Sequence, residues 1–170
     1  ERGHPAGFMG LAYLYESGTG VPEDPDQAHA WYRRAAEAGI LDAQLRLAYT
    51  ALGRGDLDGH REAARWLALA AARNDPQAMN DYAWLLATSP HDELRDGTRA
   101  LSLARRAVAR DRNPSFLDTL AAAYAELGLY NKAVATQEEA LTAAPADATR
   151  LIAELRAHLE AFRAGRPWRE

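Results

Sequence analysis

Residues 11–39 read LAYLYESGTGVPEDPDQAHAWYRRAAEAG and by themselves predict a helical hairpin. The glycines and the proline of residues 18–22 predict a turn between two helical stretches. Asp24 before Pro25 is typical of a helix N-cap followed by a proline in the first turn, and Gly39 is a natural stop. The two predicted helices are Pro5–Ser17 and Pro25–Ala38.

This hairpin recurs along the chain at spacings of 33 to 38 residues. In each copy a small alanine follows a bulky apolar residue on the first helix, and a second alanine lies on the second helix. The first set is Ala12, Ala48, Ala83 and Ala121, and the second set is Ala28, Ala63, Ala100 and Ala133. Periods in this range are typical of helical solenoids, in which each helix pair buries its apolar face against the next pair. We therefore predict an all-α fold, a right-handed superhelix of about four helix hairpins.

We expect the chain to form a single helical-repeat domain over residues 1–170, because 170 residues with 48% hydrophobic side chains can build one continuous core. After the repeats, a helix following Asp147 has apolar residues at helical spacing on one face and is suited to cap the solenoid. Trp168 is expected to fold back onto that helix. The expected parts are repeats at 4–39, 40–74, 75–111 and 114–145, a capping helix at 147–164 and a tail at 165–170.

The first two repeats resemble the Sel-one-like repeat, a relative of the tetratricopeptide repeat. The residues that carry the resemblance are Leu11–Val21, then Ala28, Trp31, Tyr32, Ala35, Ala36 and Gly39, and, in the second copy, Ala63, Trp66, Ala70 and Ala71. Residues 75–111 and 114–145 resemble the tetratricopeptide repeat instead, with Gln137 where an aromatic residue is usual. The resemblance implies a scaffold or adaptor that binds other proteins, most often in bacteria, and it supplies no catalytic residue.

The sequence start is similar to the end of a repeat, since Glu1-Arg2-Gly3 matches Glu37-Ala38-Gly39, which ends a helix. We therefore expect the sequence to be the C-terminal fragment of a longer bacterial chain. The compartment stays open between a bacterial periplasm, which the family association favours, and the cytoplasm.

Composition argues against several classes of function. The net charge of -4 supplies no basic field for nucleic acid, and no cysteine is present to form a disulfide, a thiolate metal site or a nucleophile. The five histidines are not paired at the spacing that places two metal ligands on one helical face. No apolar run is long enough to span a membrane. We therefore expect no enzyme activity, no cofactor and no metal.

The alanine register identifies candidate partner-binding residues. In stacked hairpins, residues three before, one after and four after the alanine of the first helix face the concave groove. Tyr13, Tyr49 and Trp84 would form an aromatic ladder there, and such rings are favoured anchors for protein partners, although they could instead pack sideways against the next helix. The full candidate set is Met9, Tyr13, Glu16, Leu45, Arg46, Tyr49, Asn80, Trp84 and Asp118.

The charges of this expected groove favour one kind of partner. Glu16, Asp42 and Asp118 lie on it, whereas only Arg46 and Asn80 could bind a carboxylate. We therefore expect a neutral-to-basic, partly apolar peptide or partner helix. Two alternatives stay open: a structural or oligomerisation module, including a homodimer, that packs on other domains of its own chain, and a regulatory domain of an attached enzyme.

Overall fold

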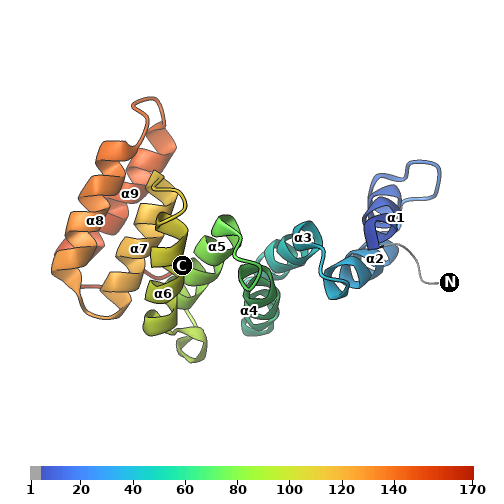
Figure 1. Ribbon diagram of the computed structural model, residues 1–170, viewed down its shortest axis with the longest axis horizontal. Helices are drawn as coiled ribbons and strands as arrows, with labels where there is room; N and C mark the ends of the chain where they lie inside the picture. Colours follow the sequence, from blue (N-terminus) through green and yellow to red (C-terminus); the bar gives the residue numbers. More distant parts are fainter. Residues whose placement is uncertain (1–4) are drawn as a thin grey trace. The chain divides into compact units, whose positions relative to one another are not determined.

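The computed structural model describes residues 5–170, and every regular element in this part of the chain is a helix (Figure 1). The resemblance of residues 1–3 to a helix end lies outside the described residues. The elements are α1 (Pro5–Ser17), α2 (Pro25–Glu37), α3 (Leu41–Leu52), α4 (Leu57–Ala71), α5 (Pro76–Thr88), the short 3₁₀ helix η1 (Asp92–Leu94), α6 (Gly97–Val108), α7 (Pro114–Glu126), α8 (Tyr130–Ala143) and α9 (Thr149–Arg163). The prediction of an all-α repeat fold is confirmed.

Neighbouring helices pair as the repeat predicts. The pairs α1 with α2, α3 with α4, α5 with α6 and α7 with α8 are each in contact, and α9 packs against α8 and touches α7. The helices form two compact units, one that ends at Arg73 and one that begins at Asn74. The boundary therefore lies between the second and third repeats of the domain that we expected to be single.

The alanine register explains how the hairpins close. All eight repeat alanines are at most 4% exposed, which places them inside the helix pairs. Gly59, at the start of α4, is another small residue at a close helix contact. A Cβ added there would lie 2.4 Å from the carbonyl oxygen of Ala51 in α3. Small residues at these points let the helix axes approach closely.

Side-chain caps fix several helix starts. The carboxylate of Asp24 accepts a hydrogen bond of 3.0 Å from the backbone N–H of Gln27, as the sequence predicts. Asn74, which follows α4, has a φ of 61°, the left-handed conformation common at helix ends. Although the sequence suggests Asp147 as the N-cap of the last helix, that interpretation is wrong: Ala148 is the N-cap of α9, and no side chain bonds there.

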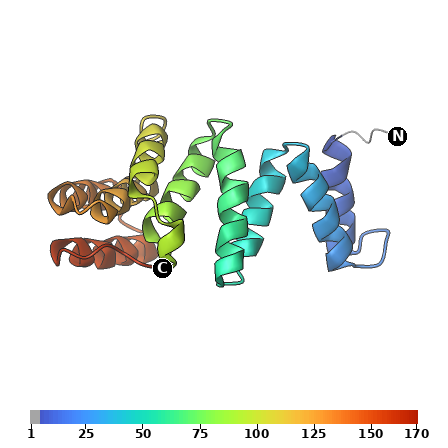
Figure 2. The same ribbon diagram turned by 90° about the horizontal axis from the view of Figure 1, so that it is seen from below.

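The second unit contains one departure from simple hairpin packing. After α9 the chain reverses and runs back to α5, so that the described C-terminal residues lie against a helix of the third repeat (Figure 2). The prediction that Trp168 folds back onto the last helix is confirmed, since its ring centroid lies 4.4 Å from that of His158.

Candidate partner-binding surfaces

Glu16 connects the first three helices of the first unit. Its carboxylate accepts a hydrogen bond of 2.7 Å from the hydroxyl of Tyr32 in α2, and it forms a salt bridge with Arg46 in α3. The guanidinium of Arg46 also lies over the Tyr32 ring, 5.1 Å from its centroid. An exposed salt bridge adds little stability, so the orientation of Arg46 rests on its contact with the Tyr32 ring as well as on Glu16.

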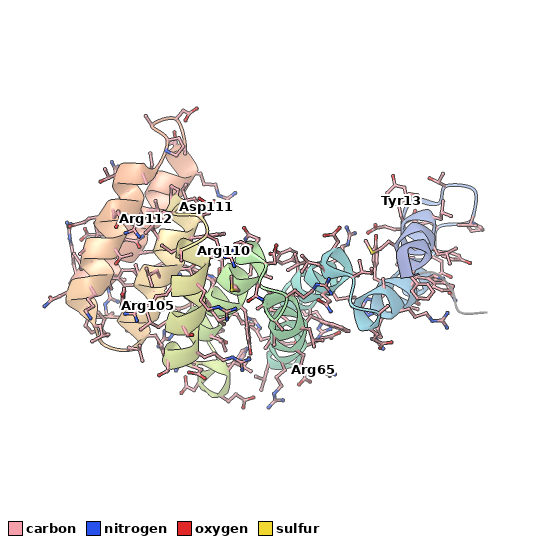
Figure 3. All side chains as sticks on the ribbon, in the orientation of Figure 1. Tyr13, Arg65, Arg105, Arg110, Asp111 and Arg112 are labelled. Carbon is pink, nitrogen blue, oxygen red and sulfur yellow. The ribbon has the colours of Figure 1, made fainter. Side chains whose placement is uncertain are left out.

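Two exposed tyrosines flank this ion pair. Tyr13 is 61% exposed and Tyr49 is 49% exposed, and Tyr13 projects from α1 (Figure 3). Residues three apart on a helix share a face, so Tyr13 lies beside Glu16 and Tyr49 beside Arg46. We call the surface formed by Tyr13, Glu16, Arg46 and Tyr49 the tyrosine face.

The buried phenol of Tyr32 contacts the tyrosine face through its hydrogen bond to Glu16. Burial raises the pKa of Tyr32 above its ordinary value of 10.0, and the neighbouring Tyr13 raises it further. The hydroxyl therefore keeps its proton and remains available as the hydrogen-bond donor to Glu16.

A pocket of about 290 Å³ opens beside the tyrosine face. Glu16, Tyr32, Arg46 and Thr50 contribute to its lining, together with apolar atoms of Ala28 and Leu47. Glu23, Pro25 and His29 complete the lining, so the pocket offers a partner both apolar atoms and hydrogen-bonding groups.

A larger pocket, of about 920 Å³, lies on the second helices of the same unit, between α2 and α4. Three of its charged residues already form ion pairs within the unit: Arg61 binds Asp58, and Glu62 binds Arg54. Leu69, also in its lining, is 51% exposed. This pocket is not on the wall that the alanine register identifies, and it provides a useful comparison surface for experiments.

Met9 and Leu45, the two apolar candidates, are half-buried. Met9 packs against the buried cluster that includes Ala12 and Leu47. Its side chain therefore supports the core behind the tyrosine face as well as bordering it.

The candidates of the second unit are not open to solvent. Asn80 and Asp118 are buried, and Trp84 is half-buried. Asp118 accepts a hydrogen bond of 2.6 Å from Gln137 of α8, and its two oxygens lie 2.8 and 3.0 Å from Nδ1 of His158 in α9. The expectation that Asp118 and Asn80 face an open groove is therefore wrong, because α7 packs against α5 and side chains of α8 and α9 enclose Asp118.

The third ring of the expected ladder is also covered. The Trp84 ring lies 5.5 Å from the ring of His158, which in turn packs against Trp168. Tyr13 and Tyr49 belong to the first unit and Trp84 to the second. Only the two tyrosines are exposed, so they are the part of the ladder that can serve as a docking surface.

These contacts change the charge expected for a partner. Of the three carboxylates on which the preference for basic partners rests, Asp118 is buried in a network and Glu16 is bound by Arg46 and Tyr32. Asp42 is exposed. The tyrosine face itself carries one acidic and one basic side chain, which are paired with each other, so Asp42 is the one of the three carboxylates left to attract a basic partner.

Sequence reasoning missed Tyr32, Gln137 and His158 as parts of these surfaces. The one available signal was Gln137, an amide where the repeat pattern has an aromatic residue. The structure explains this departure, because Gln137 is fully buried and also donates a hydrogen bond of 3.0 Å to the carbonyl oxygen of Leu155 in α9.

Residues 5–170 contain neither a metal-binding cluster nor a membrane-spanning helix. No group of three or more His, Asp or Glu side chains there is arranged to hold a metal ion. None of the described helices has the length and apolar character needed to cross a membrane.

The comparisons with known proteins identify a repeat family. A family model described as the Sel1 repeat matches residues 8–40, 41–75 and 76–111. The third match covers the stretch that we expected to resemble the tetratricopeptide repeat, so this stretch is a Sel1 repeat instead, and residues 114–145 lie outside the three matches. No curated protein matches the chain.

Two solved structures share the fold. A protective antigen present in uropathogenic Escherichia coli strains, which displays an SLR fold, is 27% identical with a TM-score of 0.62, over 92% of this chain and 33% of that chain. A Sel1 repeat protein from Oxalobacter formigenes is 23% identical with a TM-score of 0.53, over 65% of this chain and 84% of that chain. The chain thus spans about a third of the length of the first of these proteins.

Proposed function

We propose that this chain, which belongs to the Sel1 repeat family, is a non-catalytic scaffold that binds a peptide or a partner helix on the tyrosine face of its first unit. Members of this family are generally protein-interaction scaffolds. The observation that carries the proposal is the exposure of two tyrosines, Tyr13 and Tyr49, next to Arg46, which contacts both Glu16 and the Tyr32 ring.

The physical chemistry of the face supports binding. Tyrosine rings bury a large area while losing few rotamers, and their hydroxyl groups can bond to a partner backbone. Arg46 is held before any partner arrives, by Glu16 and by the Tyr32 ring, so less conformational freedom is lost on binding. Fixed aromatic and arginine side chains of this kind are the residues that most often dominate protein interfaces.

The partner fits this surface if it is partly apolar and neutral to basic. The small pocket beside the face suits an apolar side chain, and the exposed Asp42 on α3 favours a basic one nearby. An acidic segment is disfavoured, because the one arginine of the face is already bound to a carboxylate.

The test begins with peptides selected for binding to the intact chain from a random phage-displayed library. The affinity of the best peptide is then measured for the unaltered chain, for the Tyr13→Ala/Tyr49→Ala double variant and for Leu69→Ala. Leu69 is the matched control, since it is similarly exposed but lies at the other pocket of the unit. Thermal melts establish that each variant is folded.

The proposal expects the double variant to lose at least about tenfold in affinity, which is about 1.4 kcal/mol, and the control to stay within about twofold. The opposite pattern, with Leu69→Ala losing affinity and the double variant retaining it, assigns binding to the pocket between α2 and α4 and overturns the proposal.

A further inference from the structure

The residues after α9 form a segment with its own contacts. Gly165 has a φ of 67°, and the backbone N–H groups of Gly165 and Arg166 bond to the carbonyl oxygens of Phe162 and Ala161, which ends the helix. Pro167 cannot continue a helix. We call residues 166–170 the tail segment; it runs from the end of α9 back to α5 (Figure 2).

The tail segment is bound by three kinds of contact. The Trp168 ring lies 4.4 Å from the His158 ring, between centroids. Arg169 forms a salt bridge of 2.6 Å with Glu126, at the end of α7, and donates a hydrogen bond of 3.1 Å to the carbonyl oxygen of Ala87. The backbone N–H of Glu170 bonds to the carbonyl oxygen of Thr88 at 3.0 Å.

The surface that the tail segment contacts is formed by buried or partly buried groups of the second unit. Ala87 and Thr88 are at most 1% exposed, and the Glu126 side chain is 14% exposed. Glu126 is also oriented by Arg95, whose Nε donates to Oε1 of the carboxylate at 3.2 Å. A partly buried carboxylate held in this way binds a guanidinium more strongly than an exposed one does.

This surface coincides with the wall on which we expected a partner to bind. Trp84 is a candidate partner-binding residue, and Ala87 lies one turn after it on α5. In the second unit the tail segment, whose Trp168 packs on His158, takes the place of an external partner. The tail segment therefore shows which chemistry this wall accepts: an aromatic ring, then a guanidinium, on an extended backbone.

We infer that the surface formed by Ala87, Thr88, Glu126 and His158 is a binding site for an extended protein segment carrying Trp-Arg, and that the chain's own tail segment occupies it until such a partner displaces it. The tail segment can leave without unfolding α9, because Gly165 and Pro167 separate it from the helix. Local openings of this size cost less than global unfolding. The inference does not depend on the tyrosine face of the first unit.

The test uses a fluorescein-labelled peptide, GRPWRE, which copies residues 165–170 and has both ends blocked so that no terminal charge contributes. Its binding is measured by anisotropy to the unaltered chain, to a Trp168→Ala/Arg169→Ala double variant and to Arg166→Ala. Arg166 is the matched control, since it lies in the same segment but is exposed. The second peptide, GRPAAE, lacks the two anchoring side chains, because alanine replaces Trp168 and Arg169.

A segment that fills its site nine-tenths of the time lowers the apparent affinity of a competitor about tenfold. The double variant should therefore bind GRPWRE at least about tenfold more tightly than the unaltered chain and the Arg166→Ala control do, and GRPAAE should bind to none of them. Equal binding of GRPWRE to a folded double variant and to the unaltered chain overturns the inference, as does equal binding of both peptides.

A second measurement applies if the double variant does not fold. Hydrogen exchange at the Glu170 amide of the unaltered chain is followed as unlabelled GRPWRE is added to millimolar concentration. The inference expects exchange to accelerate as the peptide displaces the tail segment, and an unchanged rate contradicts it.

Discussion

His158 Nδ1 lies 2.8 Å from Asp118 Oδ1, although the two residues are separated by 40 positions in the sequence. Both side chains are buried, and Gln137 donates to the same carboxylate oxygen. The contact joins α9 to α7 inside the second unit. It makes the last helix part of that unit's interior and removes Asp118 from the surface.

Replacing Asp118 by Ala should destabilise the second unit by about 2 to 5 kcal/mol, because the buried Gln137 amide and His158 ring each lose a partner. Urea unfolding measures the effect. Asp147→Ala is the matched control, since Asp147 is exposed and its side chain does not cap α9. Equal stabilities for the two variants would show that the network contributes nothing to the fold.

Gly59→Ala should lower the free energy of unfolding by about 1 to 3 kcal/mol, because the added methyl group collides with the backbone of Ala51. Gly10→Ala provides the comparison. An added Cβ there meets nothing within 4 Å, so the variant should gain about 0.5 to 1 kcal/mol from better helix propensity. Thermal or urea denaturation of both variants decides whether α3 and α4 approach as closely as described.

Ala12→Leu should cost about 1 to 3 kcal/mol through overpacking, since Ala12 is fully buried between α1 and α2. Ala30→Leu, on the exposed side of α2, should leave stability nearly unchanged. If the melting temperatures of both variants equal that of the unaltered chain, the alanines do not set the helix crossing.

Stability should decrease at high pH through Tyr32. Its pKa is raised by burial in the folded chain, so the folded state retains a proton that the unfolded state loses above about pH 10. The contribution is fully present below that pH and is lost as pH rises through the higher folded pKa. Urea unfolding at about pH 9 and about pH 11 should show a larger loss for the unaltered chain than for Tyr32→Phe. Identical losses would contradict the assigned shift.

The helix pairs could be predicted because their signals are local. Asp24 before Pro25, the turn at Gly18 and Gly20, and an alanine at each crossing all act within one hairpin, and each is found where the sequence places it. The repeat then fixes the register of every later copy.

The surfaces could be predicted only in part, because they depend on contacts between distant residues. The register found Tyr13 and Tyr49 as outward positions, but it could not show that His158 of α9 packs against Trp84 and bonds to Asp118. It also could not show that Glu16 is bound by Tyr32 and Arg46, since salt bridges between helices follow from side-chain geometry. Gln137 alone, by departing from the repeat pattern, indicated that something different occurs in the second unit.

The central claim is that partners bind on the tyrosine face of the first unit, and hydrogen exchange of the chain with and without a saturating selected peptide tests it most directly. The account predicts slower exchange at the C-terminal turn of α1, around Tyr13 to Ser17, and in α3 from Arg46 to Leu52. Slower exchange confined to α2 and α4, around Arg33, Arg65 and Leu69, would contradict it.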